Sequence, residues 1–205
     1  MEIFSYGPKE MSFLSETDEN MGRLINHYGF LERTVNPDLF SCLVESIVAQ
    51  QISGKAADTI YAKVQKVAEK IDPRHILDAD EQTLRACGLS ARKVSYLKSA
   101  ADFFLQEGCC EENISALTKE ELIALLTQIK GVGIWTAEML MIFSLAKPDI
   151  LSYHDFGIRK SLSALYQLTS LTKTDFETYK KRFHPYASIA SFYLWQYAND
   201  NCVLK

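Results

Sequence analysis

Residues Leu125–Phe143 read LLTQIKGVGIWTAEMLMIF, a pattern that predicts the end of one helix, a tight glycine turn and a second helix. Gly131 and Gly133 permit positive φ angles and let another backbone approach closely. The free N–H groups at the start of the second helix would bind an anion such as a DNA phosphate without any net positive charge, and Lys130 would add a charge-assisted contact. Two glycines at this spacing are also typical of an ordinary packing corner, so the turn alone leaves both interpretations open.

The composition of the chain sets limits on its class. Its 205 residues are 47% hydrophobic and 23% charged, which is normal for a globular protein of one domain or two fused lobes. The net charge is −4, so any contact with nucleic acid must come from a local basic surface or from backbone amides. The N-terminus has no apolar signal segment and no window reaches transmembrane length, so we expect a soluble intracellular protein with no membrane partner.

The cysteines give no sign of a metal centre or a disulfide framework. Their number is odd, no Cys-x-x-Cys pattern occurs, and the spacing suits neither zinc nor an iron–sulfur cluster. We expect reduced thiols without a function at Cys42, Cys87, Cys109, Cys110 and Cys202.

Helical periodicity runs through nearly the whole chain, so the expected fold class is all-α. Ser90 and Thr118 are typical helix N-caps, and Glu121 completes a capping box with Thr118. Only the first few residues resemble a strand, and residues 147–152 (KPDILS) are the best candidate for a hinge. The predicted helices span residues 16–27, 36–51, 53–70, 80–86, 90–108, 118–128, 136–145, 155–166, 172–183 and 185–199.

Four stretches, in the right order, together resemble the helix–hairpin–helix superfamily of DNA glycosylases, and within it the 3-methyladenine DNA glycosylase II branch. The resemblance covers the chain from about residue 38 onward. The four stretches are FSCLVESIVAQQISGKAADTIYAKV at 40–64, GVGIWTAEMLMIF at 131–143, SYHDFGIRKSL at 152–162 and HPYASIASFYLW at 184–195.

The resemblance implies a single glycosylase unit over residues 1–205, built from two helical lobes with the active-site cleft between them. The first lobe, about 36–146, is a helical bundle that ends in the hairpin. The second lobe combines residues 1–35 with 147–205. The chain lacks room for the additional N-terminal β domain of some longer relatives, and we expect it to act as a monomer.

The resemblance also implies roles for particular residues. Asp155 matches the catalytic aspartate, and Trp135 and Tyr186 match aromatic residues of the base pocket. Met139 and Glu138, which follow Trp135 on the same helix, are expected in the same pocket. For Glu138 a structural role is favoured, with a hydrogen bond to an extruded base as the alternative. The residues expected to contact DNA are Gln51, where the family places a wedge, and Lys130, Gly131, Gly133, Ile134, Thr136, Arg159 and Lys160. No cofactor is expected to be required, although the backbone carbonyls of Thr127, Ile129 and Gly131 match a site that often holds Na⁺ or K⁺.

These residue types suit the removal of alkylated purines, such as 3-methyladenine and 7-methylguanine, from double-stranded DNA. Alkylation at a ring nitrogen makes the base cationic, so it departs as a neutral molecule without a general acid. Positive charge then develops on the sugar, where one fixed carboxylate, Asp155, stabilises it and orients or deprotonates water. Aromatic rings would bind the cationic base once it has left the duplex. The alternative interpretation makes Asp155 a helix N-cap, and one side chain can also fill both roles.

Two departures from the family pattern affect the expected activity. Glycosylases that also cleave the strand carry a lysine where this chain has Trp135, and tryptophan cannot form a Schiff base, so no lyase step is expected. Ala187 stands where the family often has arginine.

Three cations on one predicted helix, Arg92, Lys93 and Lys98, are interpreted as a solvated face.

Two other functions remain open at this point. One is a non-catalytic helix–hairpin–helix protein that binds or senses damaged DNA. The other is a glycosylase for a neutral or oxidised base, which would need a proton donor that the sequence does not obviously supply. We expect the protein in the cytoplasm, with the nucleoid if it is bacterial, or in the nucleus if it is eukaryotic.

Overall fold

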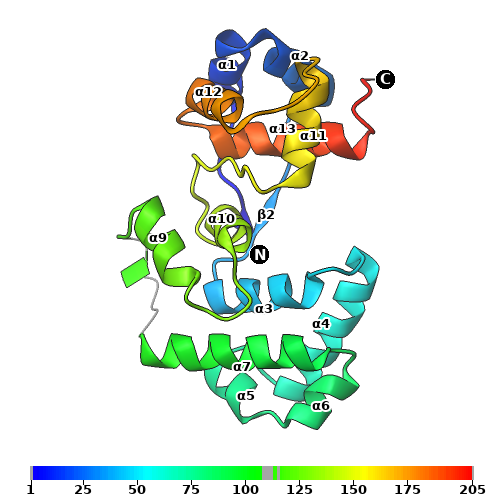
Figure 1. Cartoon of the computed structure of the whole chain (residues 1–205), viewed down its shortest axis with the longest axis vertical. Coiled ribbons are helices and arrows are strands. Elements are labelled where there is room, and N and C mark those ends of the chain that lie inside the picture. Colours follow the sequence, from blue (N-terminus) through cyan, green and yellow to red (C-terminus); the bar gives the residue numbers. More distant parts are fainter. Residues whose placement is uncertain (1, 108–112, 115, 205) are drawn as a thin grey trace. The chain divides into compact units, whose positions relative to one another are not determined.

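The computed structural model describes residues 2–107, 113, 114 and 116–204, and it is mostly helical, which confirms the all-α prediction (Figure 1). The one sheet of the described residues is an antiparallel pair, β1 (Glu2–Ile3) and β2 (Thr34–Val35). None of the helices in the described part of the chain is long and apolar enough to span a bilayer. The helices are α1 (Pro8–Thr17), α2 (Glu19–Tyr28), α3 (Leu39–Ala49), α4 (Gly54–Ala68), α5 (Pro73–Asp78), α6 (Glu81–Ala86), α7 (Ala91–Gln106), α9 (Lys119–Leu126), α10 (Ile134–Phe143), α11 (Phe156–Leu165), α12 (Lys173–Phe183) and α13 (Ala187–Asn199).

The chain divides into two compact units. Unit 1 combines Met1–Val35 with Met141–Lys205, and unit 2 is Asn36–Leu140. One boundary therefore lies inside α10, whereas the sequence suggested residue 146. The reason is that the end of α10 belongs to the core of unit 1, where the ring of Phe143 stacks on that of Trp195 with 5.6 Å between centroids.

The core of unit 2 is organised around α3. Asp38 caps this helix by accepting a hydrogen bond from the Ser41 backbone N–H at 3.0 Å. The predicted apolar stripe is confirmed, since Leu43, Ile47 and Val48 are fully buried. The helix packs against α4 and α7, and α5 covers another part of α7. These contacts fix the C-terminal end of α3, which leads into the Gln50–Gln51 loop.

The core of unit 1 is organised around α13, which α11, α12, α1 and α2 contact (Figure 1). Every residue from Ala187 to Leu194 is buried, as expected for a helix that is enclosed on all sides. Small buried side chains let neighbouring backbone come close. The Ser161 hydroxyl on α11, for example, donates to the Leu194 carbonyl at 2.6 Å.

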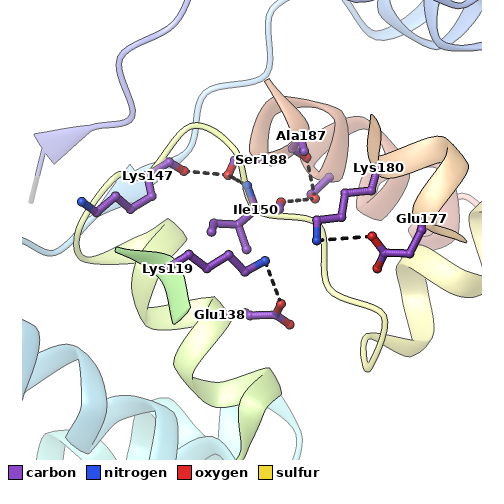
Figure 2. Close-up of polar contacts among 9 residues, drawn as sticks. Lys119, Glu138, Lys147, Ile150, Glu177, Lys180, Ala187 and Ser188 are labelled. Atoms are coloured by element: carbon purple, nitrogen blue, oxygen red, sulfur yellow. Dashed lines mark hydrogen bonds and ion pairs between the residues drawn. The ribbon is translucent and has the colours of Figure 1, made fainter. Parts of the chain in front are cut away.

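The expected hinge at 147–152 is in fact bonded to α13. The Ser188 hydroxyl donates to the Lys147 carbonyl at 2.6 Å and accepts from the Ile150 N–H at 2.9 Å, and Figure 2 shows both side by side. Ser191 donates to the Ile150 carbonyl at 3.2 Å. Two serine side chains of α13 therefore satisfy backbone N–H and C=O groups that this non-helical segment would otherwise leave without hydrogen bonds. The segment is held in place just before Asp155.

The predicted helix at 16–27 is wrong at its start, because α1 ends at Thr17 and α2 begins at Glu19. The break is made by Asp18, whose buried carboxylate accepts from the Met21 N–H at 2.8 Å as the cap of α2. Tyr166 donates to the same carboxylate at 2.8 Å and Arg182 pairs with it at 2.7 Å. Helical periodicity continues across this position, so the pattern could not reveal the break.

The predicted caps are confirmed at Ser90 and Thr118, and Glu121 completes the capping box.

Residues Gly108, Cys109 and Cys110 lie outside the described part of the chain. The described cysteines, Cys42, Cys87 and Cys202, are free thiols. Burial, reinforced by the carboxylates of Glu45 and Asp38, raises the pKa of Cys42 to about 12, so this thiol is not nucleophilic near neutral pH.

Candidate nucleic-acid and catalytic site

The hairpin of unit 2 joins α9 to α10. Gly131 has a φ of +87°, and a side-chain carbon there would collide with the ring of Tyr96 on α7. The Val132 N–H closes the turn by donating to the Ile129 carbonyl at 3.0 Å. Gly133 differs, because a side-chain carbon there would meet nothing within 4 Å. Gly131 is therefore required by the turn itself, whereas Gly133 keeps the outer surface of the hairpin bare.

A pocket of about 720 Å³ lies in unit 2 beside the hairpin, between the C-terminal end of α3 and the N-terminal end of α7. It brings together several residues that the sequence predicted to touch DNA or a base, and adds others that it did not. The predicted residues in its lining are Gln51, Gly131, Gly133, Trp135 and Thr136, and the added ones include Gln50, Arg92 and Tyr96.

The Gln50–Gln51 loop is attached to the hairpin by a side chain that the sequence analysis missed. The Gln50 side-chain amide donates to the Gly131 carbonyl at 3.1 Å, although 81 positions separate the two residues. Gln51, next along the chain, has a φ of +59°, a left-handed conformation that a non-glycine residue adopts only at a cost. Five other non-glycine residues of the described chain also have a positive φ, so the wedge role of Gln51 stays a prediction.

The cations of α7 do not form a uniformly solvated face. The Lys93 ammonium donates to the Val48 carbonyl at 2.7 Å, and burial lowers the pKa of Lys93. Lys98 donates to the carbonyls of Leu77 and Ala79 at the end of α5. Arg92, in contrast, is exposed and lines the pocket. Lys130 is exposed beside the hairpin, where its ammonium donates to the Ser95 hydroxyl at 3.0 Å.

The start of α10 presents an exposed surface and a buried one. Ile134 and Trp135 are 43% and 39% exposed, which is unusual for such large apolar side chains. Thr136 and Met139 are buried. Glu138 is also buried, and its Oε1 pairs with the Lys119 ammonium at 3.2 Å (Figure 2).

The second oxygen of Glu138, Oε2, is buried and has no hydrogen-bond partner within the described residues. The Lys119 pair agrees with the structural role that the sequence analysis favoured. The unpartnered oxygen keeps the alternative, a hydrogen bond to a donor on an extruded base, open.

Asp155 lies in unit 1 at the start of α11. It is 8% exposed, and its Oδ1 accepts from the Ile158 backbone N–H at 2.8 Å, so its interpretation as an N-cap is confirmed. The same oxygen accepts from the indole N–H of Trp195 on α13 at 3.0 Å. A buried carboxylate held by two donors in this way has a fixed orientation.

The surface around Asp155 combines aromatic and cationic side chains. Phe156, the next residue, is 79% exposed, and the sequence analysis did not single it out. Arg159 and Lys160 are exposed on the following turn, and the Arg159 guanidinium lies 5.1 Å from the centroid of the Tyr153 ring. An exposed aromatic ring next to cations is the combination that binds nucleic-acid strands.

Tyr186 lies at the N-cap of α13 and is half-buried, with its ring edge-on to that of Phe13 at 5.2 Å. Its neighbour Ala187, which stands where the family often has arginine, is completely buried. An arginine has no room there without repacking, so in this chain the position belongs to the core.

Comparisons with known proteins show the family of the chain. A family model described as "HhH-GPD superfamily base excision DNA repair protein" matches residues 44–185. The chain is 34% identical over 203 residues to "DNA-3-methyladenine glycosylase 1" of Schizosaccharomyces pombe, covering 95% of this chain and 89% of that protein.

The comparison with solved structures gives the same family. A Schizosaccharomyces pombe 3-methyladenine DNA glycosylase in complex with abasic DNA has a TM-score of 0.83 at 34% identity, covering 94% of this chain and 97% of that one. A DNA-3-methyladenine glycosidase from Bacillus halodurans has a TM-score of 0.84 at 31% identity, with 98% and 94% covered. The family match and these identities, over nearly the full length of the chain, lead to one conclusion: the chain belongs to the HhH-GPD superfamily of base excision DNA repair proteins.

Proposed function

We propose that this protein is a DNA glycosylase that hydrolyses the bond between an alkylated purine and its deoxyribose and leaves an abasic site. Its substrates would be bases of the 3-methyladenine and 7-methylguanine type in double-stranded DNA. The observation that supports this most directly is the buried, doubly hydrogen-bonded carboxylate of Asp155. The relatives named above act on the same class of lesion by their printed names.

The reaction requires one negative charge at a fixed position near the sugar. An alkylated purine is already cationic and leaves as a neutral base, so the charge that grows in the transition state lies on the sugar. A preorganised carboxylate stabilises that charge without reorganising during the reaction. Asp155 would fill this role and accept the proton of the water that attacks the sugar.

The aromatic residues would supply selectivity by charge. Flipping a base out of the duplex costs a few kcal/mol, and stacking on an aromatic ring returns roughly 1–3 kcal/mol. A cationic base gains more from such a ring than a neutral one does. We assign this contact to Trp135, which is 39% exposed, and to Met139 on the same helix, and the family resemblance gives Tyr186 of unit 1 the same kind of role.

The hairpin would bind the DNA backbone. The N-terminal end of α10 follows Gly133, where a side-chain carbon would meet nothing within 4 Å, and helix N-termini of this kind bind phosphates. Lys130, Arg159 and Lys160 would add cationic contacts, and Gln51 would enter the base stack at the lesion.

A monovalent cation at the hairpin remains a proposal. Of the three expected carbonyls, that of Ile129 already accepts from Val132, and that of Gly131 accepts from Gln50. A carbonyl oxygen has two lone pairs, so these groups and that of Thr127 still fit Na⁺ or K⁺ as oxygen ligands. The ion would hold the turn and attract a phosphate.

The test of the function is base release. Purified protein is incubated with methylated duplex DNA, and free 3-methyladenine and 7-methylguanine are measured, with ethenoadenine, hypoxanthine and 8-oxoguanine substrates in parallel. We expect release of the cationic bases above the neutral ones. DNA binding without release from any substrate would instead establish the non-catalytic damage sensor.

The mechanism predicts that Asp155→Asn loses base release by at least about a hundredfold, because the charge that stabilises the sugar is gone. The amide can still cap α11 and accept from Trp195, so stability and affinity for DNA with an abasic site should stay close to those of wild type. Unchanged turnover in this variant would remove Asp155 from the mechanism.

The absence of a lyase step is tested separately. Trp135 cannot form a Schiff base, so borohydride should not trap a covalent complex with DNA during turnover. A trapped adduct would show that another amine reacts with the sugar.

A further inference from the structure

We propose that Trp195 is a positioning residue for Asp155, and that its indole N–H sets the orientation of the carboxylate that base release requires. The inference rests on the proposed function, because it assigns to Trp195 a part in the same reaction. Trp195 lies on α13 and Asp155 precedes α11, two helices that pack together in unit 1.

The contact is a direct hydrogen bond between side chains that lie 40 positions apart. The Trp195 Nε1–H donates to Asp155 Oδ1 at 3.0 Å, and the Ile158 backbone N–H donates to the same atom at 2.8 Å. One bond would leave the carboxylate free to turn about its Cβ–Cγ axis. Two donors from different helices restrain that rotation and therefore fix the direction of Oδ2 as well.

The indole ring is itself held on several sides. It stacks on Phe143 of α10 with 5.6 Å between ring centroids and an interplanar angle of 26°. The ring of Phe192, one turn earlier on α13, lies 6.2 Å away. A donor on a ring packed in this way loses little rotational freedom when it binds the carboxylate, which is how a catalytic group is preorganised.

Gly157 gives independent support for a built arrangement. A side-chain carbon at this position would lie 3.3 Å from Asp155 Oδ1 and 3.3 Å from Cδ1 of Trp195. Both distances are tighter than ordinary van der Waals contact. A side chain at this position in the first turn of α11 would crowd both the indole and the capping carboxylate, and glycine avoids that crowding.

The simpler explanation is that a half-buried indole N–H only needs some acceptor. That explanation and ours differ in what is lost when the N–H is removed. A satisfied N–H contributes stability alone, whereas a positioning residue changes the rate of the chemical step through Asp155 and through no other group.

The test is a double-variant cycle measured under single-turnover conditions on DNA with 7-methylguanine. Trp195→Phe keeps an aromatic ring against Phe143 and removes the donor. We expect base release to slow by about tenfold or more, with affinity for DNA containing an abasic-site analogue within about twofold of wild type. In the Asp155→Asn background the same substitution should cause no further loss of rate, because coupled residues are not additive.

Tyr193→Phe is the matched control. It lies on the same helix, is fully buried, and removes the hydroxyl that donates to the Gly29 carbonyl at 2.9 Å. It should lower the melting temperature about as much as Trp195→Phe does, but leave the rate of base release unchanged. An equal loss of rate in both variants would mean that Trp195 acts only through stability.

A spectroscopic measurement keeps the inference testable if Trp195→Phe folds poorly. The chain has two tryptophans, so ¹⁵N-indole spectra of the wild type contain two side-chain signals. We expect one of them to be shifted downfield and to exchange slowly with solvent, and Asp155→Asn should move this signal far more than the other.

The outcomes separate the two proposals. No base release by the wild type overturns the proposed function and this inference with it. Release that is unchanged in Trp195→Phe, or slowed by the same factor in the Asp155→Asn background, overturns the inference alone. An indole signal that does not respond to Asp155→Asn also contradicts it.

Discussion

At the scale of single residues, buried charge is the clearest feature of the structure. Glu138 is largely enclosed, and its one charged partner among the described residues is Lys119, whose side chain is 21% exposed. Removing one member of such a pair costs more than removing both, because the remaining charge keeps its desolvation penalty.

We therefore predict that Glu138→Gln lowers the free energy of unfolding by about 1–3 kcal/mol, since Lys119 loses its partner. The double variant Glu138→Gln/Lys119→Met should recover most of that loss in urea unfolding. If stability returns while base release stays low, Glu138 also contacts the substrate. A single variant as stable as wild type would contradict the ion pair.

At the scale of elements, the hairpin depends on two glycines that have different tasks. Gly131 is required by its positive φ and by the ring of Tyr96, whereas space is open around Gly133. The same Gly-x-Gly pattern thus combines a structural position with a surface position.

The expected result for Gly131→Ala is a loss of about 1–3 kcal/mol in stability, because the side chain is both strained and overpacked. Gly133→Ala is the matched variant. It should fold with nearly normal stability and bind DNA more weakly, because its methyl group would stand where a phosphate approaches. Thermal unfolding and fluorescence anisotropy with labelled duplex measure the two effects, and equal destabilisation by both substitutions would refute the distinction.

At the scale of the whole molecule, the net charge of −4 means that any contact with DNA must come from a local basic surface or from backbone amides. Each phosphate neutralised by a cation contributes about −0.9 to the slope of log K against log salt concentration. Three contacts, from Lys130, Arg159 and Lys160, give a slope of roughly −3.

We predict that Lys130→Gln makes this slope shallower by about 0.9, because one fewer counterion is released on binding. Lys66→Gln, which removes an exposed charge from α4, should leave the slope unchanged. Titrations of duplex DNA at several salt concentrations provide the slope. A wild-type slope near zero would show that amides and uncharged contacts carry the binding alone.

Much of the fold could be predicted because its causes are local. The capping residues Ser90 and Thr118 and the apolar stripe of α3 follow from spacing along one helix, and the glycine turn follows from backbone conformation. The errors in helix boundaries arose where a side chain also contacts residues far away in the sequence. Asp18 divides a periodic stretch by capping α2, and the distant Arg182 and Tyr166 contact the same carboxylate.

The candidate site was predictable only in part. The cap at Asp155 agrees with the residue pattern, whereas the roles proposed for Asp155 and Trp135 came from the family resemblance. Trp195 and Gln50 were missed because nothing near them in the sequence marks them as partners of Asp155 or Gly131. Arg92 was set aside because a run of cations does not reveal which of them faces a pocket.

The sequence by itself determined most of the helices, the hairpin and the presence of a carboxylate at the start of α11, since each depends on residues within a few turns of one another. The tertiary structure alone decided which side chains hold these elements in working positions. Trp195 reaches Asp155 across 40 residues and Gln50 reaches Gly131 across 81. Such contacts depend on how helices pack, which periodicity along the chain does not encode.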